Sequence, residues 1–238
     1  MNQVQQQGNQ TVWYDDELLS DGPAHCFEPE YWQQQGKVTG SAQGRGTTWF
    51  VQLPQLEAAL RHYRRGGLFG KFVKDQYWFS SWEKTRSYQE FELLQCLQKA
   101  NVNVPRPIAA RAVKCGFLYR ADLLSEKVPN AQDLVDILQN GVLNREIYQE
   151  IGKMIRRMHN AGVNHTDLNI HNILIDQYQK VWIIDFDKCG FATQSDQWQQ
   201  KNLERLQRSF LKEQPHFFEP WSLECWSWLM DGYDSSFQ

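Results

Sequence analysis

The sequence predicts an α+β fold of two lobes, with strands dominating the first half of the chain and helices the second. Residues 37–53 read "KVTGSAQGRGTTWFVQL", in which two strand-like runs are separated by glycines, as in a hairpin. Residues 144–162, "NREIYQEIGKMIRRMHNAG", place apolar side chains three and four positions apart, which is the spacing of an amphipathic helix. We therefore expect an N-terminal extension (1–26), a first lobe with an antiparallel sheet and one helix (27–126), and a mainly helical second lobe (127–238).

Composition limits the class of protein. With 41% hydrophobic and 22% charged residues, the chain of 238 residues is globular and long enough for a sizeable core. A net charge of -3 predicts no general affinity for nucleic acid. The five cysteines have no CxxC spacing, which fits reduced thiols and no zinc site. The chain has neither a signal-peptide start nor an apolar run near the ~20 residues that span a bilayer, so we expect a cytoplasmic protein unless it lies on a membrane surface.

The remaining elements follow from local patterns. The glutamine-rich residues 1–36 are expected to begin flexibly and to continue with a short strand and a short helix. Residues 56–67, "LEAALRHYRRGG", fit either a strand or a short helix. The other expected elements are a helix (80–100), two strands (102–124), the helix 144–162, a buried strand (180–187), a basic helix (200–214) and a tryptophan-rich segment (218–233).

One stretch, "HTDLNIHNILID" at 165–176, crowds polar groups against an apolar run that reads as a buried strand. A short hairpin over 174–184 would bring Asp185 back beside Asn172. Amide and carboxylate oxygens are ligands that Mg²⁺ accepts, and it commonly adds substrate phosphates to them. The further carboxylate of Asp167 is suited to accept a proton from a substrate hydroxyl. The stretch therefore predicts a metal-dependent site, with a polar capping turn as the alternative.

This pattern resembles the catalytic loop of protein-kinase-like enzymes, HxDxxxxN, followed by a DFG-type aspartate. Here the two motifs are "HTDLNIHN" and "DFD". The resemblance implies that Asp167 is the catalytic base and that Asn172 and Asp185 hold Mg²⁺. It also implies that His165 orients the loop.

The same resemblance implies an ATP-binding region upstream. Gly40, Gly44 and Gly46 would let backbone N–H groups approach phosphates, although their order departs from GxGxxG and a plain hairpin turn is the alternative. Arg61 stands where the family has a strand lysine, with Lys71 and Lys74 as alternatives. Its expected partner is a helix carboxylate, Glu90 first and Glu92 second.

Departures from protein kinases point to small-molecule kinases of the same fold. The chain after Asp185 is short and has no APE motif, and Asn169 replaces the lysine usual in Ser/Thr kinases. The stretches "GRGTTWFV", "LRHYRRGGLFG", "HTDLNIHNIL", "IIDFDKC" and "NLERLQRSFLK" together resemble the lipopolysaccharide-core kinase family, in its branch that acts on 3-deoxy-D-manno-octulosonic acid (Kdo). The resemblance covers about residues 27–215.

That family implies ATP-dependent, Mg²⁺-dependent phosphorylation of the 4-hydroxyl of Kdo on a lipid A precursor, Kdo-lipid IVA. It also implies a peripheral position on the cytoplasmic face of a Gram-negative inner membrane. A heptose kinase, another small-molecule kinase of this fold and a nucleotide-binding pseudokinase are the alternatives.

Basic clusters fit such an anionic acceptor. Arg64 and Arg65 follow the expected strand, and Arg205 and Arg208 lie on the basic helix, together with Lys201 and Lys212. A solvated helix side is the alternative for that helix. The tryptophans of residues 218–233 fit either membrane headgroup contact or packing within the lobe, and we favour packing.

Overall fold

The computed structural model describes residues 2–44, 46–65, 75–192 and 196–235. The chain divides into two compact units, Met1–Glu92 with Arg106–Lys127, and Leu93–Pro105 with Val128–Gln238. The first unit carries an antiparallel sheet and the second is mainly helical, so the α+β prediction is confirmed and is compatible with a bilobal protein-kinase-like fold. The expected residue limits of the extension and the lobes stay a prediction.

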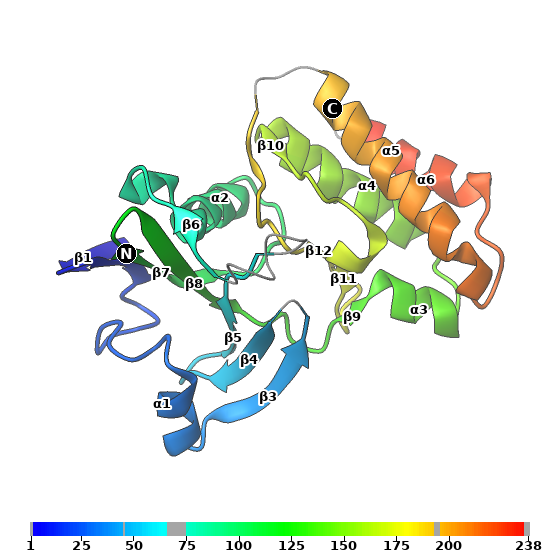
Figure 1. Ribbon diagram of the computed structural model, residues 1–238. Helices are drawn as coiled ribbons and strands as arrows, with labels where there is room; N and C mark the ends of the chain where they lie inside the picture. Colours follow the sequence, from blue (N-terminus) through cyan, green and yellow to red (C-terminus); the bar gives the residue numbers. More distant parts are fainter. Residues whose placement is uncertain (1, 45, 66–74, 193–195, 236–238) are drawn as a thin grey trace. The chain divides into compact units, whose positions relative to one another are not determined.

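The first unit is built on one antiparallel sheet in the order β1-β2-β7-β8-β5-β4-β3, with β6 also paired to β8 (Figure 1). Its strands are β1 (Asn2–Gln7), β2 (Gln10–Asp15), β3 (Val38–Gln43), β4 (Thr47–Gln52), β5 (Glu57–His62), β6 (Tyr77–Trp78), β7 (Pro107–Cys115) and β8 (Leu118–Glu126). The segment that fits a strand or a helix is therefore a strand, β5. The β3–β4 hairpin is confirmed.

The prediction of a flexible start is wrong. Strand β1 pairs with β2, and β2 pairs in turn with β7, from Gln10 opposite Val113 to Tyr14 opposite Ala109. Val12 and Trp13 of β2 are buried as a result. Strand β2 has hydrogen-bonded neighbours on both sides, which satisfies its backbone groups. Its partner β7 lies about a hundred residues away in the chain, so the local composition of the first residues gives no sign of the pairing.

Side chains pack against both faces of the sheet at its central strands. On one face, Leu60 and Leu124 pack with Phe27 and Trp32, which come from the segment around the short helix α1 (Pro29–Gln34). On the other face lie the first turns of α2 (Arg86–Lys99), whose Tyr88 ring lies 4.8 Å from that of Trp13. Helix α2 begins later than the sequence predicts, because a separate 3₁₀ turn occupies Trp82–Lys84.

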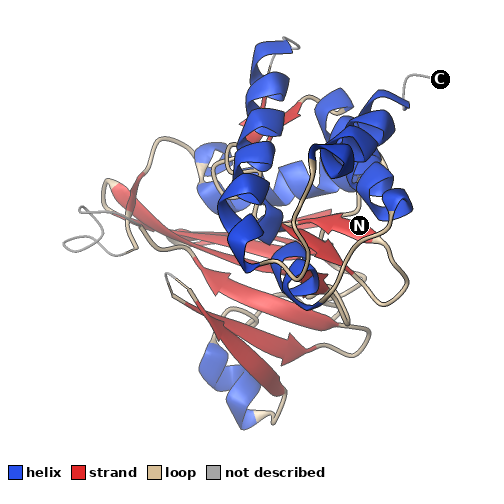
Figure 2. Ribbon diagram, turned by 90° about the vertical axis from the view of Figure 1, so that its right-hand side faces the viewer, coloured by secondary structure: helices blue, strands red, loops and turns tan. Residues whose placement is uncertain are grey.

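The second unit holds the remaining helices and short strands, and Figure 2 shows the helices grouped in blue. Its strands form two small sheets, β12-β11-β9 and β10-β13. The helices are α3 (Leu134–Asn140), α4 (Arg145–Asn160), α5 (Asp196–Glu213) and α6 (Leu223–Ser235), and the strands are β9 (Gln132–Asp133), β10 (Val163–Asn164), β11 (Ile173–Ile175), β12 (Val181–Ile183) and β13 (Gly190–Phe191).

Helix α4 is the scaffold of this unit. The side chain of Asn144 caps it by accepting a hydrogen bond from the Ile147 N–H at 3.0 Å, and Gly162 follows its end with a φ of 74°. All five predicted apolar positions are buried: Ile147, Ile151, Met154, Ile155 and Met158.

Helices α4 and α6 cross at two glycines. A Cβ added to Gly152 would lie 2.0 Å from the carbonyl oxygen of Leu229, and one added to Gly232 would lie 2.0 Å from that of Gln149. The backbones therefore touch directly, which a larger residue at either position would prevent.

The tryptophan-rich segment packs within its own unit. Trp221 is buried, and its ring stacks on Phe210 with centroids 4.9 Å apart. Trp228 lies against Tyr148 of α4. These contacts agree with the favoured interpretation, packing within the lobe, for the tryptophans of this segment. In the described parts of the chain, no helix combines the length and apolar character that a membrane crossing requires.

Candidate active site

The predicted hairpin forms and carries two of the expected metal ligands. Strands β11 and β12 pair with Ile173 opposite Ile183. Just beyond this pair, the Ile184 N–H donates to the Asn172 carbonyl oxygen at 3.0 Å. Asn172 is thereby joined to the residue that precedes Asp185.

Two amide side chains hold the loop around Asp167. The side-chain N–H groups of Asn172 and Asn169 donate to the Asp167 carbonyl oxygen at 3.0 and 2.8 Å. Because the amide nitrogen of Asn172 is used in this way, its amide oxygen is the atom suited to a cation. The carboxylate of Asp167 is 55% exposed, so the loop fixes the backbone of Asp167 while its acidic group faces solvent.

Asp185 lies at a sharp turn after β12. Its φ of 61° places a non-glycine residue in the left-handed region, which costs roughly 1 kcal/mol or more. The turn leaves Asp185 exposed while the next residue, Phe186, is fully buried against the ring of His165, with centroids 4.8 Å apart. Buried Phe186 thus anchors a strained turn that presents a carboxylate.

His165 connects the two loops. Its Nε2 lies 3.0 Å from the carbonyl oxygen of Ile184, which can only accept, so Nε2 carries the proton. Burial lowers the pKa of His165, and the side chain is therefore neutral. Its Nδ1 is buried with no hydrogen-bond partner in the described part of the chain. His165 thus lies where a residue that orients Asp185 would be expected.

Asn202 of α5 is a supporting residue that our sequence analysis missed. Its Oδ1 accepts the His165 backbone N–H at 3.1 Å, and its Nδ2 donates to Asn164 Oδ1 at 2.9 Å. A signal was present, because Asn202 lies four positions from both Trp198 and Leu206 in the apolar stripe of the helix. A polar side chain in such a stripe is usually buried for a specific partner.

The cations of the basic helix α5 have different surroundings from one another. The guanidinium of Arg205 lies 3.4 Å from Asp167 Oδ1, with the two side chains 49% and 55% exposed. Arg208 instead pairs loosely with Glu204 of the same helix at 3.9 Å. Lys201 and Lys212 are exposed. The predicted basic face therefore includes one residue that contacts Asp167 and others on a solvated side.

In the first unit, Arg61 of β5 is ion-paired with Glu90 of α2. An Arg61 guanidinium nitrogen lies 2.5 and 2.6 Å from the two Glu90 oxygens, and the Tyr63 hydroxyl also donates to Glu90. The Glu90 side chain is 5% exposed and that of Arg61 is 28% exposed. Glu92 is exposed, and Lys71 and Lys74 lie outside the described residues.

The three glycines occupy different positions in the β3–β4 hairpin. Gly40 lies within β3, at a shift of register opposite Phe50, and not in the loop as the sequence predicts. Such a bulge accommodates the extra residue inside the strand. Gly44 and Gly46 lie at the tip, where the Gly44 N–H donates to the Gly46 carbonyl at 3.0 Å.

Arg64 and Arg65 are both exposed after β5. A Cβ on Gly46 would lie 2.6 Å from Cδ of Arg64, so the arginine stem rests on this glycine. Arg65 donates to the Gln76 carbonyl at 2.6 Å and lies over the Tyr77 ring.

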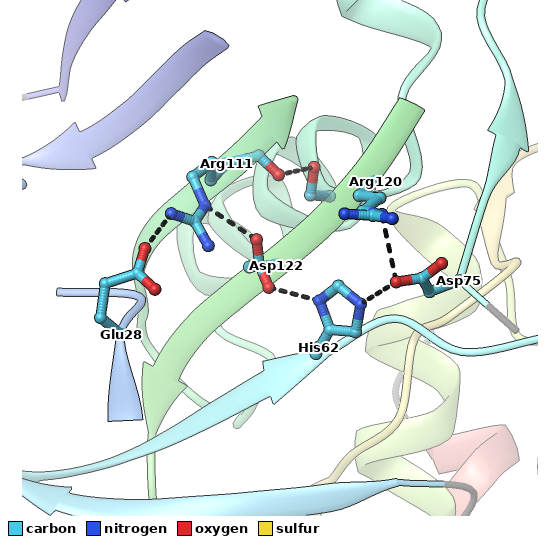
Figure 3. Close-up of polar contacts among 7 residues, drawn as sticks. Glu28, His62, Asp75, Arg111, Arg120 and Asp122 are labelled. Atoms are coloured by element: carbon cyan, nitrogen blue, oxygen red, sulfur yellow. Dashed lines mark hydrogen bonds and ion pairs between the residues drawn. The ribbon is translucent and has the colours of Figure 1, made fainter. Parts of the chain in front are cut away.

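A second polar network in the first unit, shown in Figure 3, was also missed. Buried Asp122 of β8 accepts from His62 Nδ1 at 2.6 Å and from Arg111 Nε at 2.8 Å. Arg111 also binds Glu28, and His62 binds Asp75. The hydrogen bond to Asp122 raises the pKa of His62. Because Glu28 adjoins α1, this network ties the α1 segment to the sheet.

Asn172 and Asp185 are the residues that would hold Mg²⁺ in the expected site. No group of three or more His, Cys, Asp or Glu side chains arranged to hold a metal occurs among the described residues. One amide oxygen and one carboxylate, from Asn172 and Asp185, fit an ion that takes its other ligands from phosphates and water.

Comparison with known proteins finds relatives over nearly the whole chain. Residues 29–233 match the model of the lipopolysaccharide kinase (Kdo/WaaP) family. A 3-deoxy-D-manno-octulosonic acid kinase of Vibrio cholerae is 64% identical over 227 residues, which cover 95% of this chain and 96% of that protein. Proteins of the same name from Vibrio vulnificus and Photobacterium profundum are 59% identical over 235 residues (99% of each chain) and 54% identical over 226 residues (95% of each chain).

Proposed function

The chain belongs to the lipopolysaccharide kinase (Kdo/WaaP) family, and from this premise we propose that it transfers the γ-phosphoryl group of ATP to the 4-hydroxyl of Kdo on a lipid A precursor. The observation that carries the proposal is the loop geometry. Asn169 and Asn172 hold the Asp167 backbone, and the Asp167 carboxylate, which contacts Arg205, remains about half exposed.

Each group of the loop has a part in the reaction. The oxygen of the sugar hydroxyl bonds to the γ-phosphorus, and Asp167 accepts the proton of that hydroxyl. At the same time the bond between the γ-phosphorus and the bridging oxygen breaks, and ADP leaves. Asn172 and Asp185 hold Mg²⁺, which neutralises charge on the ATP phosphates when bound. His165 keeps the Asp185 turn in place through Ile184 and Phe186.

The first unit supplies phosphate-binding groups in this proposal. Arg61 binds ATP phosphates, and Glu90 with Tyr63 fixes its guanidinium. Gly44 and Gly46 let the hairpin tip approach the nucleotide. Arg64 and Arg65 bind the anionic groups of the acceptor, as does Arg208 in the second unit.

We further propose that the protein meets its acceptor at the cytoplasmic surface of the inner membrane, because a lipid-linked sugar resides in a bilayer. The cations of α5 and the exposed Phe218 and Leu223 that follow it support such a contact. Sedimentation with vesicles that contain anionic lipid tests it, and binding unaffected by Phe218→Ser with Leu223→Ser would contradict a role for these residues.

The test of the activity is transfer of label from γ-labelled ATP to a Kdo-bearing lipid A precursor in the presence of Mg²⁺. We expect transfer by the wild type and a loss of ~10²–10⁴-fold in Asp167→Asn. Asp231→Asn is the matched control, because Asp231 is a similarly exposed aspartate, 47% exposed, paired with Arg145. Its rate should equal that of the wild type.

Three results would argue against the proposal. A wild-type rate in Asp167→Asn would show that Asp167 is not the general base. Transfer only to a heptose-bearing acceptor would identify a sibling enzyme of the family. Nucleotide binding without any transfer would indicate a pseudokinase.

A further inference from the structure

Three polar side chains of α5 face the catalytic loop at helical spacing. Asn202 accepts the His165 N–H at 3.1 Å, and Ser209 Oγ accepts the Ile170 N–H at 3.1 Å. Arg205 lies between them and contacts Asp167 at 3.4 Å. Positions three and seven apart share one face of a helix. Helix α5 is therefore bound to the loop on both sides of Arg205.

The loop itself contains no lysine or arginine. From residue 165 to 172 it reads "HTDLNIHN". A phosphoryl group in transfer carries negative charge on its equatorial oxygens, so a cation close to the base lowers the barrier. Arg205 brings such a charge to the base from a separate element, 38 positions along the chain.

A contribution to the stability of the fold does not account for the ion pair between Arg205 and Asp167. Both side chains are about half exposed, and exposed ion pairs typically contribute little to the free energy of unfolding. A guanidinium carries five N–H donors in a planar fork, so contact with one carboxylate oxygen leaves donors for a second anion. The hydrogen bonds of Asn202 and Ser209 to the loop fix the part of the helix backbone that carries Arg205.

Resting on the proposed function, we propose that Arg205 is the cation of the catalytic loop: it positions the Asp167 carboxylate and binds the phosphoryl group as it transfers. This role differs from that of an acceptor-binding surface arginine. It predicts an effect on turnover rather than on acceptor affinity, because the transferring group exists only in the transition state.

The experiment compares Arg205→Gln and Arg205→Lys with Arg145→Gln in the full-length protein. Arg145 pairs with Asp231 at 3.1 Å with 54% and 47% exposure, so it is a matched arginine–aspartate pair. We expect Arg205→Gln to lower kcat about 10²-fold with unchanged KM for ATP and acceptor and unchanged Tm. Arg205→Lys should recover part of that loss, and Arg145→Gln should equal the wild type.

A double-mutant cycle shows whether Arg205 acts through Asp167. Arg205→Gln combined with Asp167→Asn should be little slower than Asp167→Asn alone, because the two side chains act as a unit. Added guanidinium ion, at concentrations below denaturation, should raise the rate of Arg205→Ala but not that of Asp167→Asn.

The outcomes separate this inference from the proposed function. Wild-type kcat in Arg205→Gln, an effect confined to the acceptor KM, or additive losses in the cycle would each overturn the role of Arg205 alone. Transfer only to an acceptor without Kdo would overturn the proposed acceptor, while the Arg205 comparison remains valid with that acceptor. A wild-type chain with no transfer to any acceptor would overturn both.

Discussion

The side-chain oxygen of Asn202 accepts a hydrogen bond from the backbone N–H of His165 across 3.1 Å. Through this contact a helix that follows the catalytic loop in the chain holds the first residue of that loop. The same amide also reaches Asn164, and His159 Nε2 lies 3.4 Å from its oxygen. A single buried side chain thus joins α4, α5 and the start of the loop.

Asn202→Ala should lower both stability and turnover. It leaves the buried His165 N–H without an acceptor, and each such unsatisfied group costs about 1–3 kcal/mol. We expect a lower urea midpoint and a reduced kcat. Asn140→Ala is the control, since its exposed amide bonds only to the Asp136 carbonyl. Equal stability of the two variants would contradict the assigned role.

Gly152→Ala should destabilise the second unit by roughly 3 kcal/mol. The added methyl would overlap the Leu229 carbonyl at 2.0 Å, and overpacking of this kind typically costs about 1–3 kcal/mol or more. Gly141→Ala is the control, because its Cβ would meet only the Ile137 oxygen at 3.9 Å. Thermal unfolding of the two variants decides the matter, and a wild-type Tm for Gly152→Ala would contradict the close crossing.

Replacing Arg61 should weaken ATP binding as well as the fold. Arg61→Ala removes the guanidinium partner of the buried Glu90 carboxylate, and we expect a loss of about 1–3 kcal/mol in unfolding free energy and a higher KM for ATP. Arg61→Lys should be intermediate, because an ammonium keeps the positive charge but offers it as a compact point charge with three donors instead of five. Arg106→Ala breaks the Asp15 pair in the same unit and should change stability without changing KM for ATP.

The stabilising contribution of His62 should decline as pH rises. Its pKa is raised by Asp122, so the folded state binds the proton more tightly than the unfolded chain, whose value is near 6.5. The contribution is complete below that value and is lost as pH rises through the folded-state pKa. The difference in unfolding free energy between wild type and His62→Gln, measured from pH 6 to 9, should therefore shrink. A constant difference would show that the charge of His62 has no part in it.

The contribution of His159 should change in the opposite direction. Burial lowers its pKa to about 4, and its Nδ1 lies 2.7 Å from the Tyr233 hydroxyl. The neutral ring is favoured in the fold, so the contribution is complete above about 6.5 and is lost as pH falls toward 4. Urea unfolding of wild type and His159→Gln between pH 7 and 4 should show a shrinking difference, and a growing one would contradict the assignment.

Much of the candidate site was predictable because it is local. The spacing of Asp167 and Asn172 lies within one loop, and the hairpin that returns Asp185 is short enough to be read from its apolar strands. Helix α4 was predictable for the same reason, since its stripe and its cap are continuous in sequence. Local patterns failed where one strand pairs with a distant one, as β2 does with β7.

The amino-acid sequence by itself determined the class of fold and the spacing of the acidic and amide side chains in the proposed catalytic loop, since both depend on order along the chain. Only the tertiary structure decided which cation of α5 meets Asp167, that Asn202 holds His165, and that Asp122 joins His62 to Arg111. Helix α5 carries four cations, Lys201, Arg205, Arg208 and Lys212. Which of them reaches the loop depends on how the helix packs. That packing is set by contacts among buried side chains that are distant in sequence.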